Sequence, residues 1–170
     1  MRVVQRGSGI GDWRSRRGRA AVVRVALWTL AALWMGTEPA EAAQCSFSTS
    51  SVSFGAYNVF TSGPNDTVGT IRFECNGGAK HVVVAITSGT AGSFAPRSLG
   101  GGLDRLSYNL YQNASRTSVW GDGSAGSQPY YVGDPPNKQE QTLTIYARIP
   151  AGQDVSAGSY SDSVTVVVLY

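Results

Sequence analysis

The sequence AGSYSDSVTVVVLY, residues 157–170, ends the chain and decides its fold class. Alternate positions in it are apolar or aromatic: Tyr160, Val164, Val166, Val168 and Tyr170. Successive side chains of a strand point to opposite faces of a sheet, so this alternation of β-branched residues predicts a β-strand. Toward Tyr170 both faces become apolar, as in a strand buried within a sheet. Nothing after Tyr170 offers a partner, so we expect a sheet that this chain does not complete by itself.

Upstream, short alternating stretches are separated by turns rich in Gly, Asn and Pro. They predict strands over residues 46–54, 67–75, 81–87, 106–112 and 142–149. The stretch 81–87 is apolar on both faces and is expected to be a central strand. The glycine-rich residues 88–104 and residues 113–140 are expected to be irregular. Because no segment after residue 43 has a helical period, the sequence predicts an all-β, immunoglobulin-like antiparallel β-sandwich.

Residues 1–42 have the features of a secretion signal. Seven arginines precede an apolar run over residues 25–35, and Ala40-Glu41-Ala42 supplies a cleavage site. We therefore expect cleavage between Ala42 and Ala43. A membrane anchor is the alternative, but a spanning helix needs about 20 apolar residues, more than this run supplies. The expected mature chain is one domain, residues 43–170, without an integral membrane segment.

Removal of this leader reverses the charge of the protein. The whole chain has 14 basic and 11 acidic residues, and seven of the former and three of the latter lie in residues 1–42. The mature domain is left with 7 − 8 = −1. Its composition therefore offers no basic surface for nucleic acid.

The two cysteines, Cys45 and Cys75, both remain after the expected cleavage. In an oxidising compartment, two cysteines of a small exported domain form one disulfide by default. A reactive or metal-binding thiol pair is the alternative, but His81 is the one histidine available to support it. We expect the disulfide.

Catalytic chemistry finds little support in the sequence. A Ser/His/Asp triad would need His81, which begins an apolar strand and is expected to be structural. The acidic residues are scattered, mostly in turns, and whether two of them converge as in a glycosidase stays open. Trp120 belongs either to an exposed binding loop or, as we expect, to the packing beside a turn. We expect no catalytic residue, no cofactor and no metal.

Several motifs together resemble a known family. They are Cys45 just after the leader, Cys75, Tyr108-Asn109-Leu110-Tyr111, Trp120-Gly121, the stretch YARIPAG at 146–152 and the stretch GSYSDSV at 158–164. Over residues 45–170 this pattern resembles the spore coat protein U domain family, which includes subunits of archaic chaperone–usher pili. Gln112 departs from the family, which often has an acid there.

The resemblance implies a sandwich that lacks its final strand. A periplasmic chaperone would fill the gap first, and the N-terminal extension of a neighbouring subunit would then replace it. An outer-membrane usher would assemble the subunits, which pass through the periplasm to a pilus or coat at the cell surface. The expected groove residues are Phe47, Val52, Phe54, Tyr160, Val164, Val166, Val168 and Tyr170.

We therefore expect a secreted, non-enzymatic structural subunit of a surface pilus or coat. Ala43 and Gln44 alone separate the cleavage site from Cys45, too few to donate a strand, which favours a terminal, adhesive tip position. One alternative is a spore-coat or matrix protein that is not built into a fibre. Another is a secreted carbohydrate-binding or hydrolytic β-sandwich.

Overall fold

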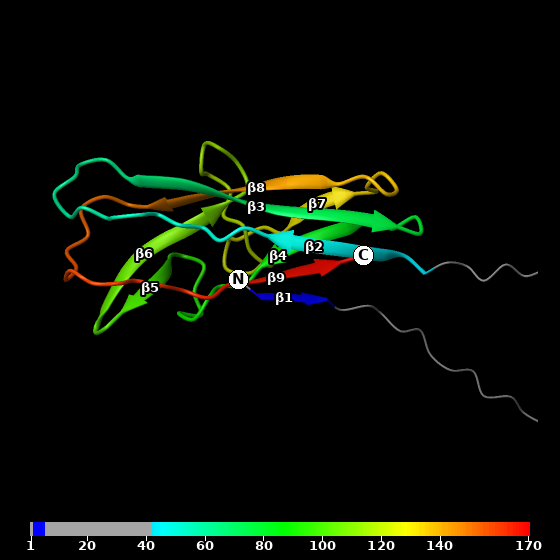
Figure 1. Ribbon diagram of the computed structural model, residues 1–170. Helices are drawn as coiled ribbons and strands as arrows, with labels where there is room; N and C mark the ends of the chain where they lie inside the picture. Colours follow the sequence, from blue (N-terminus) through cyan, green and yellow to red (C-terminus); the bar gives the residue numbers. More distant parts are fainter. Residues whose placement is uncertain (1, 6–41) are drawn as a thin grey trace, which may run out of the picture. The chain divides into compact units, whose positions relative to one another are not determined.

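The computed structural model describes residues 2–5 and 42–170, and every regular element in them is a β-strand (Figure 1). The apolar run of the expected leader lies outside the described residues. The strands are β1 (Arg2–Gln5), β2 (Gln44–Thr49), β3 (Asn65–Asn76), β4 (Val82–Ile86), β5 (Arg97–Gly101), β6 (Asp104–Tyr111), β7 (Tyr130–Gly133), β8 (Gln141–Ile149) and β9 (Thr165–Leu169). The expectation of an all-β chain is confirmed.

The strands form two sheets that pack as layers (Figure 1). One has four strands in the order β1-β9-β4-β7, and the other has five in the order β2-β3-β8-β6-β5. The pairs are antiparallel except for β1 and β9, which run parallel. β4 lies between β9 and β7, so the prediction that residues 81–87 form a central strand is confirmed.

The core lies between the two sheets and follows the alternation of the sequence. On the five-stranded side, Ile71 and Ile145 have no exposed surface, and on the other side the same holds for Val84 and Val166. Burying such side chains stabilises the fold by about 1.5–3 kcal/mol each relative to leaving them in water.

A disulfide joins Cys45 to Cys75, as the sequence predicts. The two cysteines lie directly opposite each other on β2 and β3, with Cα atoms 4.1 Å apart. Both side chains belong to the buried hydrophobic cluster. The bond therefore fixes the edge strand β2 on its neighbour.

We expect the double variant Cys45→Ala/Cys75→Ala to lower the free energy of unfolding by about 3–4 kcal/mol, because the unfolded chain loses a loop constraint. The measurement is urea unfolding of the full chain, with the oxidised wild type as reference and the reduced wild type as control. Reduced wild type and double variant should agree. A double variant as stable as the oxidised wild type would show that the cross-link does not contribute.

Two predicted loops contain strands. β5 lies within the expected loop 88–104 and pairs with β6, and β7 lies within the expected irregular region 113–140. A Cβ on Gly101 would lie 2.5 Å from the Tyr160 ring, so the absence of a side chain lets residues 159–161 approach β5. Gly101 therefore permits close contact between strands, although the glycine-rich sequence around it predicts a loop.

Two predicted strands are shorter than expected. β2 ends at Thr49, although residues 50–54 continue the alternation, and β9 begins at Thr165. Ser161 instead makes an isolated bridge to Gly100, on the opposite sheet. The end of the chain therefore contacts both sheets in succession.

Candidate strand-accepting groove

β9 has a partner strand on each of its two edges, one antiparallel and one parallel. On one side β9 pairs antiparallel with β4, from Val83↔Leu169 to Ile86↔Val166. On the other side it pairs parallel with β1, from Arg2↔Thr165 to Gln5↔Val168. Within residues 42–170, no strand pairs with this second edge. The expectation that the chain itself offers no strand for this edge is wrong, because β1, which lies within the predicted leader, pairs with it. That residues 43–170 lack a final strand stays a prediction.

The eight predicted groove residues all belong to one hydrophobic cluster. Val166 and Val168 are fully buried, and the other six are partly buried. The Phe47 ring centroid lies 5.9 Å from that of Phe73 and 6.3 Å from that of Tyr170. That these residues contact an inserted strand stays a prediction.

A cavity of about 820 Å³ lies next to the segment that precedes β9 in the chain. It lies between residues 52–59 and residues 155–162, with Leu99, Leu106 and Ile149 in its lining. A smaller cavity of about 120 Å³ lies between residues 51–54 and Val164. We refer to these two cavities and the second edge of β9 as the groove. β1 pairs with residues 165–168, none of which lines either cavity.

One wall of the larger cavity, residues 52–59, is held by side chains rather than by a sheet. The Tyr57 hydroxyl donates to the carbonyl of Pro150 at 3.1 Å and accepts from the backbone N–H of Gln153 at 2.9 Å. Asn65 Nδ2 donates to the carbonyl of Phe54 at 3.0 Å. The sequence gives no sign of Tyr57, because its role depends on contacts between loops.

The opposite wall, residues 155–162, is anchored to the β5–β6 hairpin. The backbone groups of Ser161 and Gly100 exchange hydrogen bonds of 2.8 and 3.0 Å. Asp104 Oδ2 accepts from the N–H of Ser156 at 2.8 Å, and hydrogen bonding by Ser156 lowers the pKa of Asp104. Both walls are therefore fixed without an inserted strand.

Arg97 is a fully buried cation at the start of β5. Its guanidinium donates to the carbonyls of Thr87 at 3.0 Å and Trp120 at 2.6 Å and to Asn109 Oδ1 at 2.7 Å. Burial lowers its pKa to about 10. This role is not predictable from the sequence, because arginine side chains usually lie in solvent.

Trp120 is a packing residue, and the expectation of packing is confirmed. Its side chain has no exposed surface, its Nε1–H donates to the carbonyl of Val84 at 2.9 Å, and its ring lies 5.4 Å from that of Tyr130. A fully buried indole offers nothing to a ligand at the surface.

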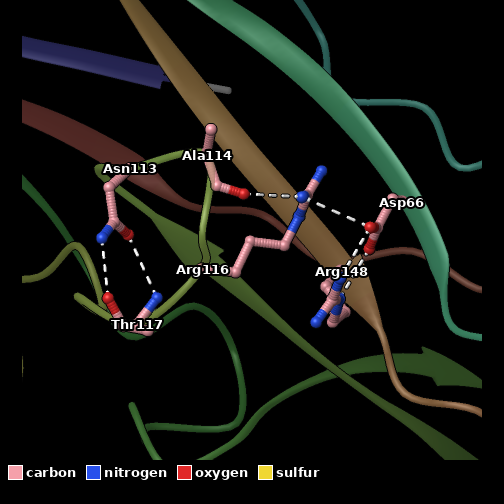
Figure 2. Close-up of polar contacts among 6 residues, drawn as sticks. All are labelled: Asp66, Asn113, Ala114, Arg116, Thr117 and Arg148. Carbon is pink, nitrogen blue, oxygen red and sulfur yellow. Dashed lines mark hydrogen bonds and ion pairs between the residues drawn. The ribbon is translucent and has the colours of Figure 1, made fainter.

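A polar cluster fixes the 113–117 loop on the outer face of the five-stranded sheet, away from the core (Figure 2). Arg148 donates to both oxygens of Asp66 at 2.7 and 2.8 Å, and Arg116 reaches the same carboxylate at 3.3 Å. The hydrogen bond from Arg148 lowers the pKa of Asp66. The side-chain amide of Asn113 donates to the hydroxyls of Ser115 and Thr117, so it stabilises the loop from within.

The described residues show no grouping typical of metal chemistry. Within residues 2–5 and 42–170, no three His, Cys, Asp or Glu side chains are placed to hold a metal ion. His81 is exposed, and its backbone N–H donates to Asp134. The same residues contain no helix long and apolar enough to cross a bilayer.

Comparisons with known proteins give a family match, a curated relative and a structural relative. Residues 31–167 match the Spore Coat Protein U domain. The chain is 34% identical over 68 residues to "Protein U" of Myxococcus xanthus, a match that covers 39% of this chain and 35% of that protein. It also resembles a chain in the crystal structure of the CsuC–CsuE chaperone–tip adhesion subunit pre-assembly complex of Acinetobacter baumannii. That likeness has a TM-score of 0.54 at 21% identity and covers 76% of this chain and 40% of the other.

Proposed function

Because the chain belongs to the Spore Coat Protein U domain family, we propose that it is a non-enzymatic structural subunit of a surface pilus or coat. In this proposal its groove receives a β-strand from another protein. The observation that carries the proposal is the second edge of β9. Within residues 42–170 this edge has no partner strand, and two cavities lie beside residues 155–164, which precede β9 in the chain.

Physical chemistry explains why such an edge needs a partner. Unpaired N–H and C=O groups along an apolar strand are a template for aggregation. An inserted strand pairs these groups, and its alternate side chains enter the cavities, so the backbone provides affinity and the side chains provide specificity. The pairing of β9 with β1 supports this reading, because a strand from the expected leader adds to this same edge.

The partners we propose follow from the structural relative. In Acinetobacter baumannii, a chaperone and a tip adhesion subunit form a pre-assembly complex of archaic chaperone–usher pili. For this chain we propose a periplasmic chaperone, an outer-membrane usher and a neighbouring subunit that donates the final strand. The route is export through the periplasm to the cell surface.

A terminal, adhesive position in a fibre is the finer part of the proposal. Cleavage after Ala42 would leave Ala43 and Gln44 ahead of Cys45, and two residues span about 7 Å when extended. Gln44 already belongs to β2. Such a subunit accepts a strand and donates none, which suits the end of a fibre. N-terminal sequencing of the exported protein measures the length of this segment.

The test of strand acceptance compares residues 43–170 with and without an added strand. Exported alone, the domain should aggregate or be degraded because the edge of β9 is open. Fusion of ten alternating Val and Thr residues after Tyr170, through a four-residue linker, should give a soluble, protease-resistant monomer.

The control fusion replaces every second residue of the added strand with proline, which cannot donate backbone hydrogen bonds. It should not rescue the domain. If residues 43–170 alone form a stable monomer, the need for an inserted strand disappears and the proposed function fails.

A further inference from the structure

Residues 160–169 cross from one sheet to the other. Ser161 exchanges backbone hydrogen bonds with Gly100 of β5, in the five-stranded sheet. Four residues later, the N–H of Thr87 donates to the carbonyl of Thr165 at 2.9 Å, and from there β9 follows β4 in the four-stranded sheet. Strands that switch sheets form the corners of a sandwich.

Asp162 lies at this crossing, and its carboxylate binds two other segments of the chain and the N–H of the next residue. Oδ1 accepts from the N–H of Thr90 at 2.8 Å, from the Thr90 hydroxyl at 2.7 Å and from the N–H of Ser163 at 2.8 Å. Oδ2 accepts from the hydroxyl of Tyr108, on β6, at 2.7 Å. Tyr108 is only 4% exposed, so Asp162 gives its hydroxyl a partner inside the protein.

Asp162 also lines both cavities of the groove. It therefore lies at the end of the wall formed by residues 155–162, three residues before β9 begins. If the backbone of this wall is already ordered before a strand binds, binding does not incur the entropy cost of ordering it. Ordering one residue only on binding would cost roughly a factor of ten in affinity.

We propose that Asp162 is a positioning residue for strand uptake: it holds residues 160–164 at the crossing so that the groove is formed before a strand enters. This inference rests on the proposed function. Asp162 need not touch the inserted strand. It acts through the segment that it anchors to Thr90 and Tyr108.

The loop that contacts Asp162 supplies a matched pair of variants. Gly89 has φ +80°, and a Cβ there would overlap the Asp162 carboxylate. Gly92 has φ +69°, and a Cβ there would meet nothing within 4 Å. Alanine at either position incurs the strain of a left-handed backbone. Only Gly89→Ala also displaces Asp162.

The experiment uses the full chain and a fluorescein-labelled ten-residue peptide of alternating Val and Thr. Wild type and variants are refolded under oxidising conditions with the peptide, and binding is measured by fluorescence anisotropy. The urea midpoint of each chain is measured without peptide. Because β1 occupies the same edge in the full chain, the apparent affinities are compared between variants and not taken as absolute values.

Asp162→Ala and Gly89→Ala are expected to weaken peptide binding roughly tenfold or more. Gly92→Ala should bind within about threefold of wild type even when its urea midpoint falls as far as that of Gly89→Ala. Asp162→Asn should retain most binding, because its Oδ1 still accepts from Thr90 and its amide can donate to the Tyr108 hydroxyl. A purely structural role would instead make binding follow the urea midpoint in all four variants.

Equal binding by wild type, Asp162→Ala and Gly89→Ala overturns the inference and leaves the proposed function intact. Equal weakening by Gly89→Ala and Gly92→Ala also overturns it, since strain alone would then explain the loss. If Asp162→Ala does not fold, the comparison of the two glycine variants decides. Failure of the fused strand to rescue residues 43–170, which lack β1, removes the proposed function and this inference together.

Discussion

Val166→Asp is expected to abolish the folded state. Val166 has no exposed surface and lies on the inward face of β9, opposite Ile86 of β4. An aspartate there loses the burial of a valine and places a carboxylate in an apolar core, at a cost of about 4 kcal/mol or more. Since small domains are stable by about 5–15 kcal/mol, we expect little protease-resistant protein. Urea unfolding and limited proteolysis of the full chain measure the effect.

Leu169→Asp is the matched control, because it introduces the same side chain into the same strand. Leu169 is 48% exposed and lies on the opposite face of β9. Its replacement should change the unfolding free energy by less than about 1 kcal/mol. If the two variants were equally stable, β9 would be shifted by one residue, which exchanges its faces.

Arg97→Met should cost about 3–5 kcal/mol of unfolding free energy. Methionine fills most of the volume but donates nothing, so the buried carbonyls of Thr87 and Trp120 lose the donor they share. Arg97→Lys should also destabilise the protein, because an ammonium cannot reproduce the planar set of donors of a guanidinium. Urea unfolding of the full chain is the measurement.

Arg105→Met serves as the control for Arg97→Met. Arg105 lies in β6, the strand paired with β5, but its side chain is exposed. We expect a change within about 0.5 kcal/mol. If Arg97→Met behaves like Arg105→Met, the hydrogen bonds of the buried guanidinium contribute no net stability.

Alternation alone predicts the regular strands well. The expected strands 67–75 and 142–149 agree with β3 and β8 to within two residues at each end. The burial of Val166 and Val168 follows from the parity of β9, because one apolar face must meet the core. The disulfide follows from the number of cysteines and the expected compartment.

Three features could not be predicted from the sequence: β5, β1 and the cavity walls. Each depends on contacts between segments that are distant in the chain. β5 carries two glycines and a buried arginine, so no apolar alternation marks it. β1 lies in a basic stretch that reads as a targeting signal, and its pairing with β9 depends on an edge formed at the other end of the chain. The cavity walls likewise need hydrogen bonds such as that from Tyr57 to Pro150, which no local pattern encodes.

The position of the disulfide has a mechanical consequence. Cys45 is the second residue of β2, at the end where the chain enters the domain. Tension on the residues before Gln44 would otherwise peel β2 from β3, one pair of hydrogen bonds after another. The bond to Cys75 passes this load directly to β3, which is flanked by β2 and β8 inside its sheet. While the bond is oxidised, β2 carries no load and the domain resists unravelling from its N-terminal side.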